Sequence, residues 1–275
     1  MVKQLLKRAL GAHYTPRMRH LKRRLEVRFL GKGEPELALL PRVLDPGAVS
    51  IDIGANIGDY LDVLTRHSRR VIAFEPHPVC FANLQAIGLG KCTILNLALS
   101  DRAGTAMLTV PVEAEEVTGL ATIEPANRSF APTAARLQEY EVRVARLDDA
   151  LAEQLRPDER VAFIKIDVEG HEHAVIAGAQ ATIGKHRPIV LLETEYRHGA
   201  PIRAIFELFA ARGYLARILH VGRMTPVDPV RLRELQRDYA VGDIVKDVQV
   251  NDYVNNVWFI PGEQTEALAR LGADG

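Results

Sequence analysis

Cysteine is scarce in this 275-residue chain, and its scarcity excludes two classes of small protein domain. Cys80 and Cys92 are the two cysteines present, too few for a disulfide framework or for a zinc knuckle. We therefore expect two reduced thiols in a cytoplasmic protein.

Long apolar runs are also lacking. No stretch approaches the roughly eighteen uninterrupted apolar residues of a membrane-spanning segment, so no transmembrane helix is predicted. Near the N-terminus, Lys3, Lys7 and Arg8 interrupt the leucines, which argues against the apolar core of a signal peptide. The length instead suits one large α/β domain with a substantial core.

The chain has no net charge of either sign, because 35 Lys and Arg residues balance 35 Asp and Glu residues. The whole chain therefore gives no reason to predict a nucleic-acid partner. The balance is uneven, since residues 1–32 hold ten Lys and Arg and a single acid, Glu26. We expect a basic helical arm over residues 1–33, in which Met18, Leu21 and Leu25 keep helical spacing.

Three roles fit this arm. The default is a solvated helix packed on the domain. The second is a peripheral helix at the inner face of an anionic membrane, because cations flank leucines along residues 1–32. The third, RNA binding, has the least support, since few aromatic residues stand among the charges.

From residue 49 onward, apolar runs of strand length alternate with segments of helical spacing. Strands separated by helices of this length predict a parallel, doubly wound α/β sheet. The predicted strands are 49–54, 70–76, 92–99, 161–168, 188–195, 214–221 and 254–261. The predicted helices are 34–44, 57–67, 78–88, 148–155, 171–185, 201–212 and 229–239. Residues 104–146 depart from the alternation and predict an antiparallel excursion beside the main sheet, while 34–263 form the domain and 264–275 a tail.

Two short motifs predict a nucleotide-like ligand. "IDIGANIG", residues 51–58, joins a strand to a helix through Gly54 and Gly58, which would let backbone N–H groups approach a ligand. It matches neither the G-x-G-x-x-G fingerprint nor a phosphate loop. "FEP" ends the next strand with Glu75, about 20 residues after Gly54, where a carboxylate can accept both hydroxyls of a ribose. A tight turn and a solvated acid would explain each motif alone, but together they favour a cofactor that contains a nucleoside.

The run "FIKIDVEGHEHAVIAGA", residues 163–179, places three acids at the mouth of an apolar strand. Asp167 ends the strand beside the glycine loop, where doubly wound sheets bind their ligands. Glu169 lies in the turn that follows. Glu172 shares the face of the next helix that packs on the sheet, so its carboxylate needs either a ligand or the free amides of the helix start. His171 could act as a base, although a surface histidine is the simpler interpretation.

These motifs, with "NLALSDRAG" and "RPIVLLETE", resemble the FkbM family of class I S-adenosylmethionine-dependent methyltransferases, over residues 34–261. The resemblance implies a mostly parallel, seven-stranded Rossmann-like sheet and O-methylation of a hydroxyl on a saccharide or another natural product. It implies that S-adenosylmethionine is the cofactor and that its ribose binds Glu75. The residues expected around the cofactor are Asp52, Gly54, Ala55, Asn56, Gly58, Glu75, Pro76, Ala98, Ser100 and Asp167. Ala98 stands where the family usually has an adenine-binding acid.

Transfer to an alcohol also needs a base that accepts the hydroxyl proton. Asp167 is the first candidate, followed by Glu193, Glu172 and His171. Asp167 with Glu193 or Glu195 could hold a magnesium ion, but paired acids without an ion are favoured because no third ligand is evident.

The sequence thus predicts an O-methyltransferase that acts on a glycan, a lipid-linked sugar or a secondary metabolite. A nicotinamide-dependent oxidoreductase and a non-catalytic cofactor-binding scaffold are the alternatives. The acceptor and the oligomeric state are not predicted.

Overall fold

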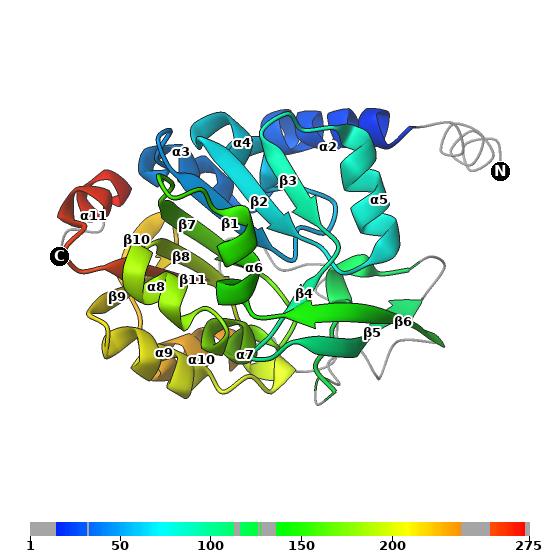
Figure 1. Cartoon of the computed structure of the whole chain (residues 1–275). Helices are drawn as coiled ribbons and strands as arrows, with labels where there is room; N and C mark the ends of the chain where they lie inside the picture. Colours follow the sequence, from blue (N-terminus) through cyan, green and yellow to red (C-terminus); the bar gives the residue numbers. More distant parts are fainter. Residues whose placement is uncertain are drawn as a thin grey trace.

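The computed structural model describes residues 15–31, 33–112, 116–125, 127, 136–237 and 254–272. Its centre is an eight-stranded sheet, ordered β10-β9-β11-β8-β7-β1-β2-β3 (Figure 1). In that order the strands are β10 (Arg223–Pro226), β9 (Tyr214–His220), β11 (Asn256–Pro261), β8 (Ile189–Glu193), β7 (Val161–Ile166), β1 (Val49–Ile53), β2 (Arg70–Phe74) and β3 (Cys92–Leu95). The run from β8 to β3 is parallel, and β11 is antiparallel to both β8 and β9. The predicted doubly wound, mostly parallel sheet is confirmed.

The sheet has eight strands where the sequence predicted seven. The additional strand, β10, pairs antiparallel with β9 at the edge of the sheet. Val221 and Gly222 form the turn between them, with φ angles of 49° and 72°. Two consecutive positive φ angles are typical of a tight β-hairpin turn. The sequence prediction ended the strand 214–221 at this turn and did not include the strand that follows it, β10.

Helices cover both faces of the main sheet and bury its alternating side chains in two clusters. One face carries α6 (Leu147–Gln154), α7 (Glu172–Ala177), α8 (Gln180–His186), α9 (Ile202–Ala210) and α10 (Pro229–Arg237). The other carries the 3₁₀ turn η1 (Pro35–Ala38), α3 (Leu40–Val43), α4 (Leu61–His67), α5 (Pro78–Ile87) and α11 (Thr265–Leu271). The predicted tail, 264–275, therefore includes a helix whose Leu268 and Leu271 are buried. Residues 238–239 of the predicted helix 229–239 lie outside the described residues.

Three predicted helices are shorter or divided. The helix predicted over 34–44 is divided into η1 and α3, since Pro41 has no N–H to continue an α-helix. The helix predicted over 57–67 begins only at Leu61, because Gly58 holds a φ of +88° in the preceding turn. The helix predicted over 171–185 is divided into α7 and α8. Both carboxylate oxygens of Asp148 accept backbone N–H groups at the start of α8, which gives this second helix its own cap.

The antiparallel excursion predicted over 104–146 is confirmed as a three-stranded sheet beside the main one (Figure 1). It consists of β4 (Ala98–Leu99), β6 (Arg136–Ala145) and β5 (Gly104–Val112). The strand predicted over 92–99 is thus divided between two sheets. At the division, the Asn96 side chain donates to the carbonyl oxygens of Glu75 and Pro76 at 2.9 Å each, which turns the chain out of the main sheet.

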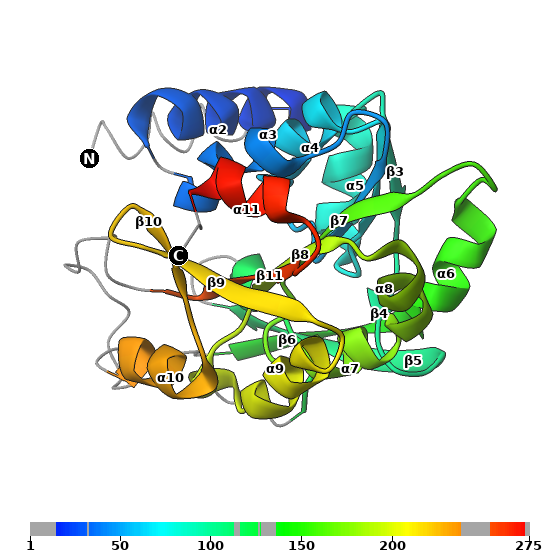
Figure 2. The same ribbon diagram turned by 90° about the vertical axis from the view of Figure 1, so that its left-hand side faces the viewer.

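The described part of the predicted basic arm is one helix, α2 (Pro16–Leu30), which lies along the outside of the domain next to α4 and α5 (Figures 1 and 2). Thr15 caps its start, and Gly31 ends it with a φ of 62°. Residues 1–14 and 32 lie outside the described residues. Among the helices that the structure describes, none combines the length and the apolar character that crossing a membrane requires.

Candidate active site

The turn after β1 is held by close backbone packing. Gly54 has a φ of +82°, and a Cβ atom built on it would lie 1.8 Å from the carbonyl oxygen of Asp167. The glycine is therefore required by the neighbouring strand, whatever ligand the turn also binds. Asn56, two residues later, has a φ of 45°, a conformation uncommon for residues other than glycine. Its side-chain oxygen accepts a hydrogen bond from Thr118 at 2.8 Å.

Glu75 lies immediately after β2 and is 4% exposed. One carboxylate oxygen accepts the backbone N–H of Asn56 at 2.6 Å, and the other accepts that of His77 at 2.7 Å. Burial raises the pKa of Glu75 to about 7, although both amide hydrogen bonds act to lower it. Each oxygen keeps acceptor capacity beyond these amides, so the carboxylate can still bind the two hydroxyls of a ribose.

A cavity lies at the carboxyl ends of β1, β2 and β7, where doubly wound sheets bind their ligands. Six of the residues predicted or considered for the cofactor line it: Gly54, Asn56, Glu75, Pro76, Ala98 and Asp167. One end is apolar and is lined by Leu97, Ala98, Leu99, Leu108 and Ile123. Ala98, at the position where the family usually has an acid, lies in this apolar part of the cavity.

Four of the predicted cofactor residues lie elsewhere. Ala55 and Gly58 shape the turn beside the cavity, with Gly58 packed against Leu84. Asp52 is buried beneath the turn, opposite Lys165 in the β1–β7 pair, and burial raises its pKa to about 7 against the effect of that lysine. Ser100 lines a second cavity instead.

Part of the chain between β5 and β6, within the described residues 116–125, forms one wall of this cavity. Thr118, Gly119, Ala121 and Ile123 line the cavity wall. In addition to the hydrogen bond from Thr118 to Asn56, the hydroxyl of Thr122 donates to the carbonyl oxygen of Glu169 at 2.7 Å. These bonds fasten this cover segment, residues 116–125, to the turn after β1 and to the turn after β7.

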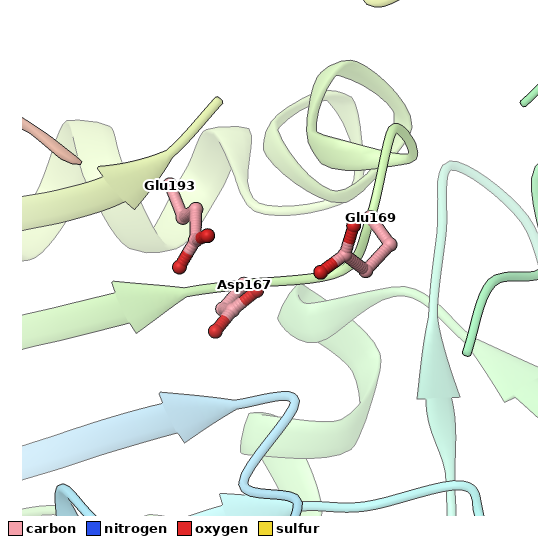
Figure 3. A group of neighbouring side chains, drawn as sticks. All are labelled: Asp167, Glu169 and Glu193. Atoms are coloured by element: carbon pink, nitrogen blue, oxygen red, sulfur yellow. The ribbon is translucent and has the colours of Figure 1, made fainter. Parts of the chain in front are cut away.

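Three carboxylates converge where the cavity meets β7 and β8. Figure 3 shows Asp167 just past β7, Glu193 at the end of β8, and Glu169 in the turn that leads to α7. One oxygen from each lies within 4.8 Å of the others. Glu169 also holds a φ of 52°, a strained conformation that typically occurs at functional sites. The sequence interpretation that no third acid accompanies Asp167 and Glu193 was therefore wrong.

A buried lysine lies beside two of these three carboxylates. Lys165, in β7, is 1% exposed. Its Nζ lies 3.6 Å from Asp167 Oδ2, 3.4 Å from Glu193 Oε2 and 3.2 Å from Asn256 Oδ1. Burial would lower the pKa of Lys165, but the surrounding acids, led by Asp167, outweigh burial and raise it. The ammonium ion therefore already neutralises part of the charge that a metal ion would.

A second group of polar residues extends the cluster across the sheet. Tyr60 donates its hydroxyl to Glu34 at 2.5 Å, and the Asn256 amide donates to the same Glu34 oxygen at 2.8 Å. The Lys165 Nζ lies 5.0 Å from the centre of the Tyr60 ring. Asn255 donates to the other oxygen of Glu193 at 2.7 Å. Each oxygen of Glu193 thus has a fixed donor or cation, which sets the orientation of its carboxylate.

Burial shifts the acids of this cluster toward their protonated forms. It is the first cause that raises the pKa of Asp167, and Lys165 opposes it. Burial and the charge of Asp167 raise the pKa values of Glu169 and Glu193 well above their usual range. Beside Glu169, His198 Nε2 lies 3.1 Å from Glu169 Oε2, and burial lowers the pKa of His198 to about 4. A histidine whose pKa is lowered by burial thus lies next to a carboxyl group whose pKa is raised by burial.

The remaining predicted catalytic residues lie away from the cavity wall. Glu172 is 1% exposed and accepts the backbone N–H of Gly170 at 2.7 Å, the helix-start arrangement that the sequence left open. His171 is not a surface residue. Its Nε2 lies 2.8 Å from the Ser100 hydroxyl and its Nδ1 lies 3.0 Å from a Glu124 oxygen. It joins the end of β4 to the cover segment and so holds the cover in place.

Comparison with known proteins agrees with this geometry. The methyltransferase FkbM domain matches residues 52–216. The chain is 32% identical over 163 residues to 31-O-demethyl-FK506 methyltransferase FkbM of Streptomyces tacrolimicus, across 50% of this chain and 61% of that protein. It is 30% identical over 152 residues to methyltransferase sdnD of Sordaria araneosa, across 46% and 59%. The chain thus spans less than two thirds of the length of either curated relative.

Among solved structures, methyltransferase FkbM from Methylobacillus flagellatus KT aligns with a TM-score of 0.48 and 16% identity, over 80% of this chain and 47% of that one. The domain match covers more than half of the chain and includes the glycine turn, Glu75, the acid cluster and Lys165. This chain therefore belongs to the FkbM family of methyltransferases.

Proposed function

We propose that this protein is an S-adenosylmethionine-dependent O-methyltransferase whose acceptor is a hydroxyl of a saccharide or a related natural product. The observation that carries the proposal is the order of groups along one cavity. An apolar end suits the adenine, Glu75 lies where a ribose would bind, and the turn at Gly54 leads to the acids at Asp167.

S-adenosylmethionine supplies an electrophilic methyl group on a positively charged sulfur. Asp167, at the end of the cavity beside Gly54, attracts that charge and orients it. The segment over the cavity excludes water from the reacting groups. Alignment of the acceptor oxygen with the methyl group then contributes most of the rate enhancement.

The acceptor hydroxyl must lose its proton. Asp167 and Glu193 are the candidate bases, because Lys165 stabilises a negative charge on either carboxylate. Glu169 and His198 form a second proton-holding pair within 3.1 Å at the same crevice. Glu172 and His171 serve as supports, since their side chains are engaged by Gly170 and by Ser100.

No ion is needed to keep these acids together, because Lys165 already lies within 3.6 Å of two of them. We therefore expect methyl transfer to persist after dialysis against a chelator. Loss of transfer on chelation and its return with magnesium would instead identify Asp167, Glu169 and Glu193 as metal ligands.

The proposal is tested by calorimetry with S-adenosylhomocysteine and NAD, followed by a transfer assay with labelled S-adenosylmethionine and a panel of glycans, lipid-linked sugars and polyketides. Asp167→Asn should keep cofactor affinity within a few-fold while turnover falls by about 10²–10⁴-fold, the range for loss of a base. Asp158→Asn is the matched control, because that aspartate is exposed and pairs with Arg69 far from the cavity. Binding of NAD without S-adenosylhomocysteine would overturn the assignment.

A further inference from the structure

The basic helix α2 contacts the domain through its charged side. Arg23 forms a pair of hydrogen bonds with Asp59, the shorter at 2.5 Å, and Arg24 lies 2.7 Å from Asp62. His20 is buried and lies 3.2 Å from Asp62. A helix on a soluble domain normally buries its apolar stripe and exposes its charges. Here ionic groups occupy most of the side that contacts the domain, and Val27 is the apolar residue of α2 that packs against the core.

The apolar stripe of α2 consequently faces outward. Met18, Leu21 and Leu25 share one side of the helix at three- and four-residue spacing, and they are 47%, 53% and 48% exposed. Phe29, 69% exposed, continues the same line by one turn. Three or four neighbouring large apolar side chains on one helix form a contiguous patch, and such patches mark interaction sites.

Positive charge flanks this stripe. Lys22, beside it on the helix surface, has a side chain that is 67% exposed and lies 3.9 Å from Glu26, and Arg19 is exposed one position before His20. Long cationic side chains at the edge of an apolar stripe can extend to phosphate groups while their stems stay among apolar atoms. This combination is typical of helices that lie in the plane of an anionic membrane surface.

We propose that the Met18–Leu21–Leu25 face of α2 binds an anionic membrane surface. A second copy of this chain fits less well, since pairing two such faces would bring Arg19 and Lys22 of one copy toward like charges of the other. A negatively charged bilayer accepts both the leucines and the flanking cations. This inference goes beyond methyl transfer and does not rest on it.

Docking by this face would place the cofactor turn close to the membrane. Asp59 and Asp62, the partners of α2, directly follow that turn, and the His20 ring lies 3.9 Å from a Cβ atom built on Gly58. Ile57, within the turn, is 50% exposed.

The test is flotation of the full chain with vesicles of phosphatidylcholine, with and without about one third phosphatidylglycerol. We expect binding to the anionic vesicles at about 0.05 M salt and much weaker binding at about 0.5 M, where charges are screened. Leu21→Ser with Leu25→Ser should lower the partition coefficient by about tenfold or more, because two apolar side chains lose their burial in lipid. Lys22→Glu should lower it by about fivefold or more at low salt.

The matched control is Met107→Ser with Val230→Ser, two comparably exposed apolar residues on β5 and α10. It should bind vesicles like the wild type, and all variants should keep the wild-type circular dichroism spectrum. Failure of the full chain to float with anionic vesicles at low salt would overturn the proposal, as would wild-type binding by the Leu21/Leu25 variant. Sedimentation as a dimer that the same variant abolishes, without vesicle binding, would assign the face to a second copy and also overturn it.

Discussion

Removing the buried lysine should make the stability of this protein unusually dependent on pH. Lys165→Met keeps the length and apolar stem of the side chain but deletes a cation that lies within 3.6 Å of Asp167 and Glu193. Removing one partner of a buried pair typically costs about 3–5 kcal/mol, since the remaining charge loses its counterion. The two acid side chains are 29% and 14% exposed, so water can compensate in part and we expect about 3 kcal/mol at pH 8.

The sign of the pH dependence follows from the acids that remain. Burial already raises the pKa values of Asp167 and Glu193, and loss of Lys165 removes an interaction that lowers both. An acid whose pKa is higher in the folded than in the unfolded state stabilises the fold at low pH, and that contribution is lost as the pH rises through the folded value. For each proton that the folded variant holds and the folded wild type does not, the loss of stability in the variant should shrink by about 1.4 kcal/mol per pH unit as the pH falls. Between pH 8 and pH 6 this amounts to roughly 2.7 kcal/mol.

Urea unfolding of wild type and Lys165→Met at several pH values between 5 and 8 measures this deficit. Lys185→Met, which deletes an exposed lysine in α8, is the control and should change stability by less than about 0.5 kcal/mol at every pH. Adding Glu193→Gln to Lys165→Met should recover part of the loss, because it removes an unpaired charge. A deficit below about 1 kcal/mol that does not change with pH would refute the view that Lys165 stabilises the ionised form of these acids.

Other substitutions test the cofactor side of the site. Glu75→Gln should weaken S-adenosylhomocysteine binding by at least about tenfold in calorimetry, since hydrogen bonds to a charged group contribute about 1.5–3 kcal/mol each and its amide group would face a backbone N–H; unchanged affinity would remove Glu75 from the ribose site. Gly54→Ala should lower the melting temperature whatever its effect on ligand binding, because its Cβ atom would lie 1.8 Å from the Asp167 carbonyl oxygen. A wild-type melting curve would contradict that packing. Thr118→Val should weaken the cover over the cavity through its lost bond to Asn56 and increase the dissociation rate of S-adenosylhomocysteine in stopped-flow measurements; an unchanged rate would show that this bond does not hold the cover.

The elements that sequence predicted best are those with a strong local pattern. The buried runs of β1, β2, β7 and β8 are mostly apolar, and a glycine or an acid ends each of them. The predicted helix boundaries were wrong where a tertiary contact determines the backbone conformation. One example is Gly178, where α7 stops, because a Cβ atom there would lie 2.0 Å from the Ser100 carbonyl oxygen. No periodicity within residues 171–185 indicates this contact, because Ser100 lies 78 residues earlier in the chain than Gly178.

The sequence predicted Gly54 and Glu75, which line the cavity, but it predicted the acid cluster around Lys165 only in part. Glu75 and Gly54 sit at strand ends, whose place in a doubly wound sheet is fixed by topology. Lys165 was missed although a signal exists, since a lysine inside an apolar strand is almost never buried without an acidic partner. Glu34 and Asn256 could not be associated with it, because 222 residues separate these two hydrogen-bonded side chains.

The placement of α2 shows why a charge count cannot decide what a basic segment binds. Counting cations in residues 1–32 suggests that the arginines contact an external partner such as a membrane. In the structure, however, Arg23 is paired with Asp59 and Arg24 with Asp62, both of the domain itself. Those pairs hold the helix on the domain and thereby turn its leucines toward the outside. The energy of any membrane contact should consequently come mainly from apolar burial, with Lys22 and its neighbours setting the preference for anionic lipid. Salt should therefore weaken vesicle binding without abolishing it, whereas Leu21→Ser with Leu25→Ser should lower binding by about tenfold or more at every salt concentration.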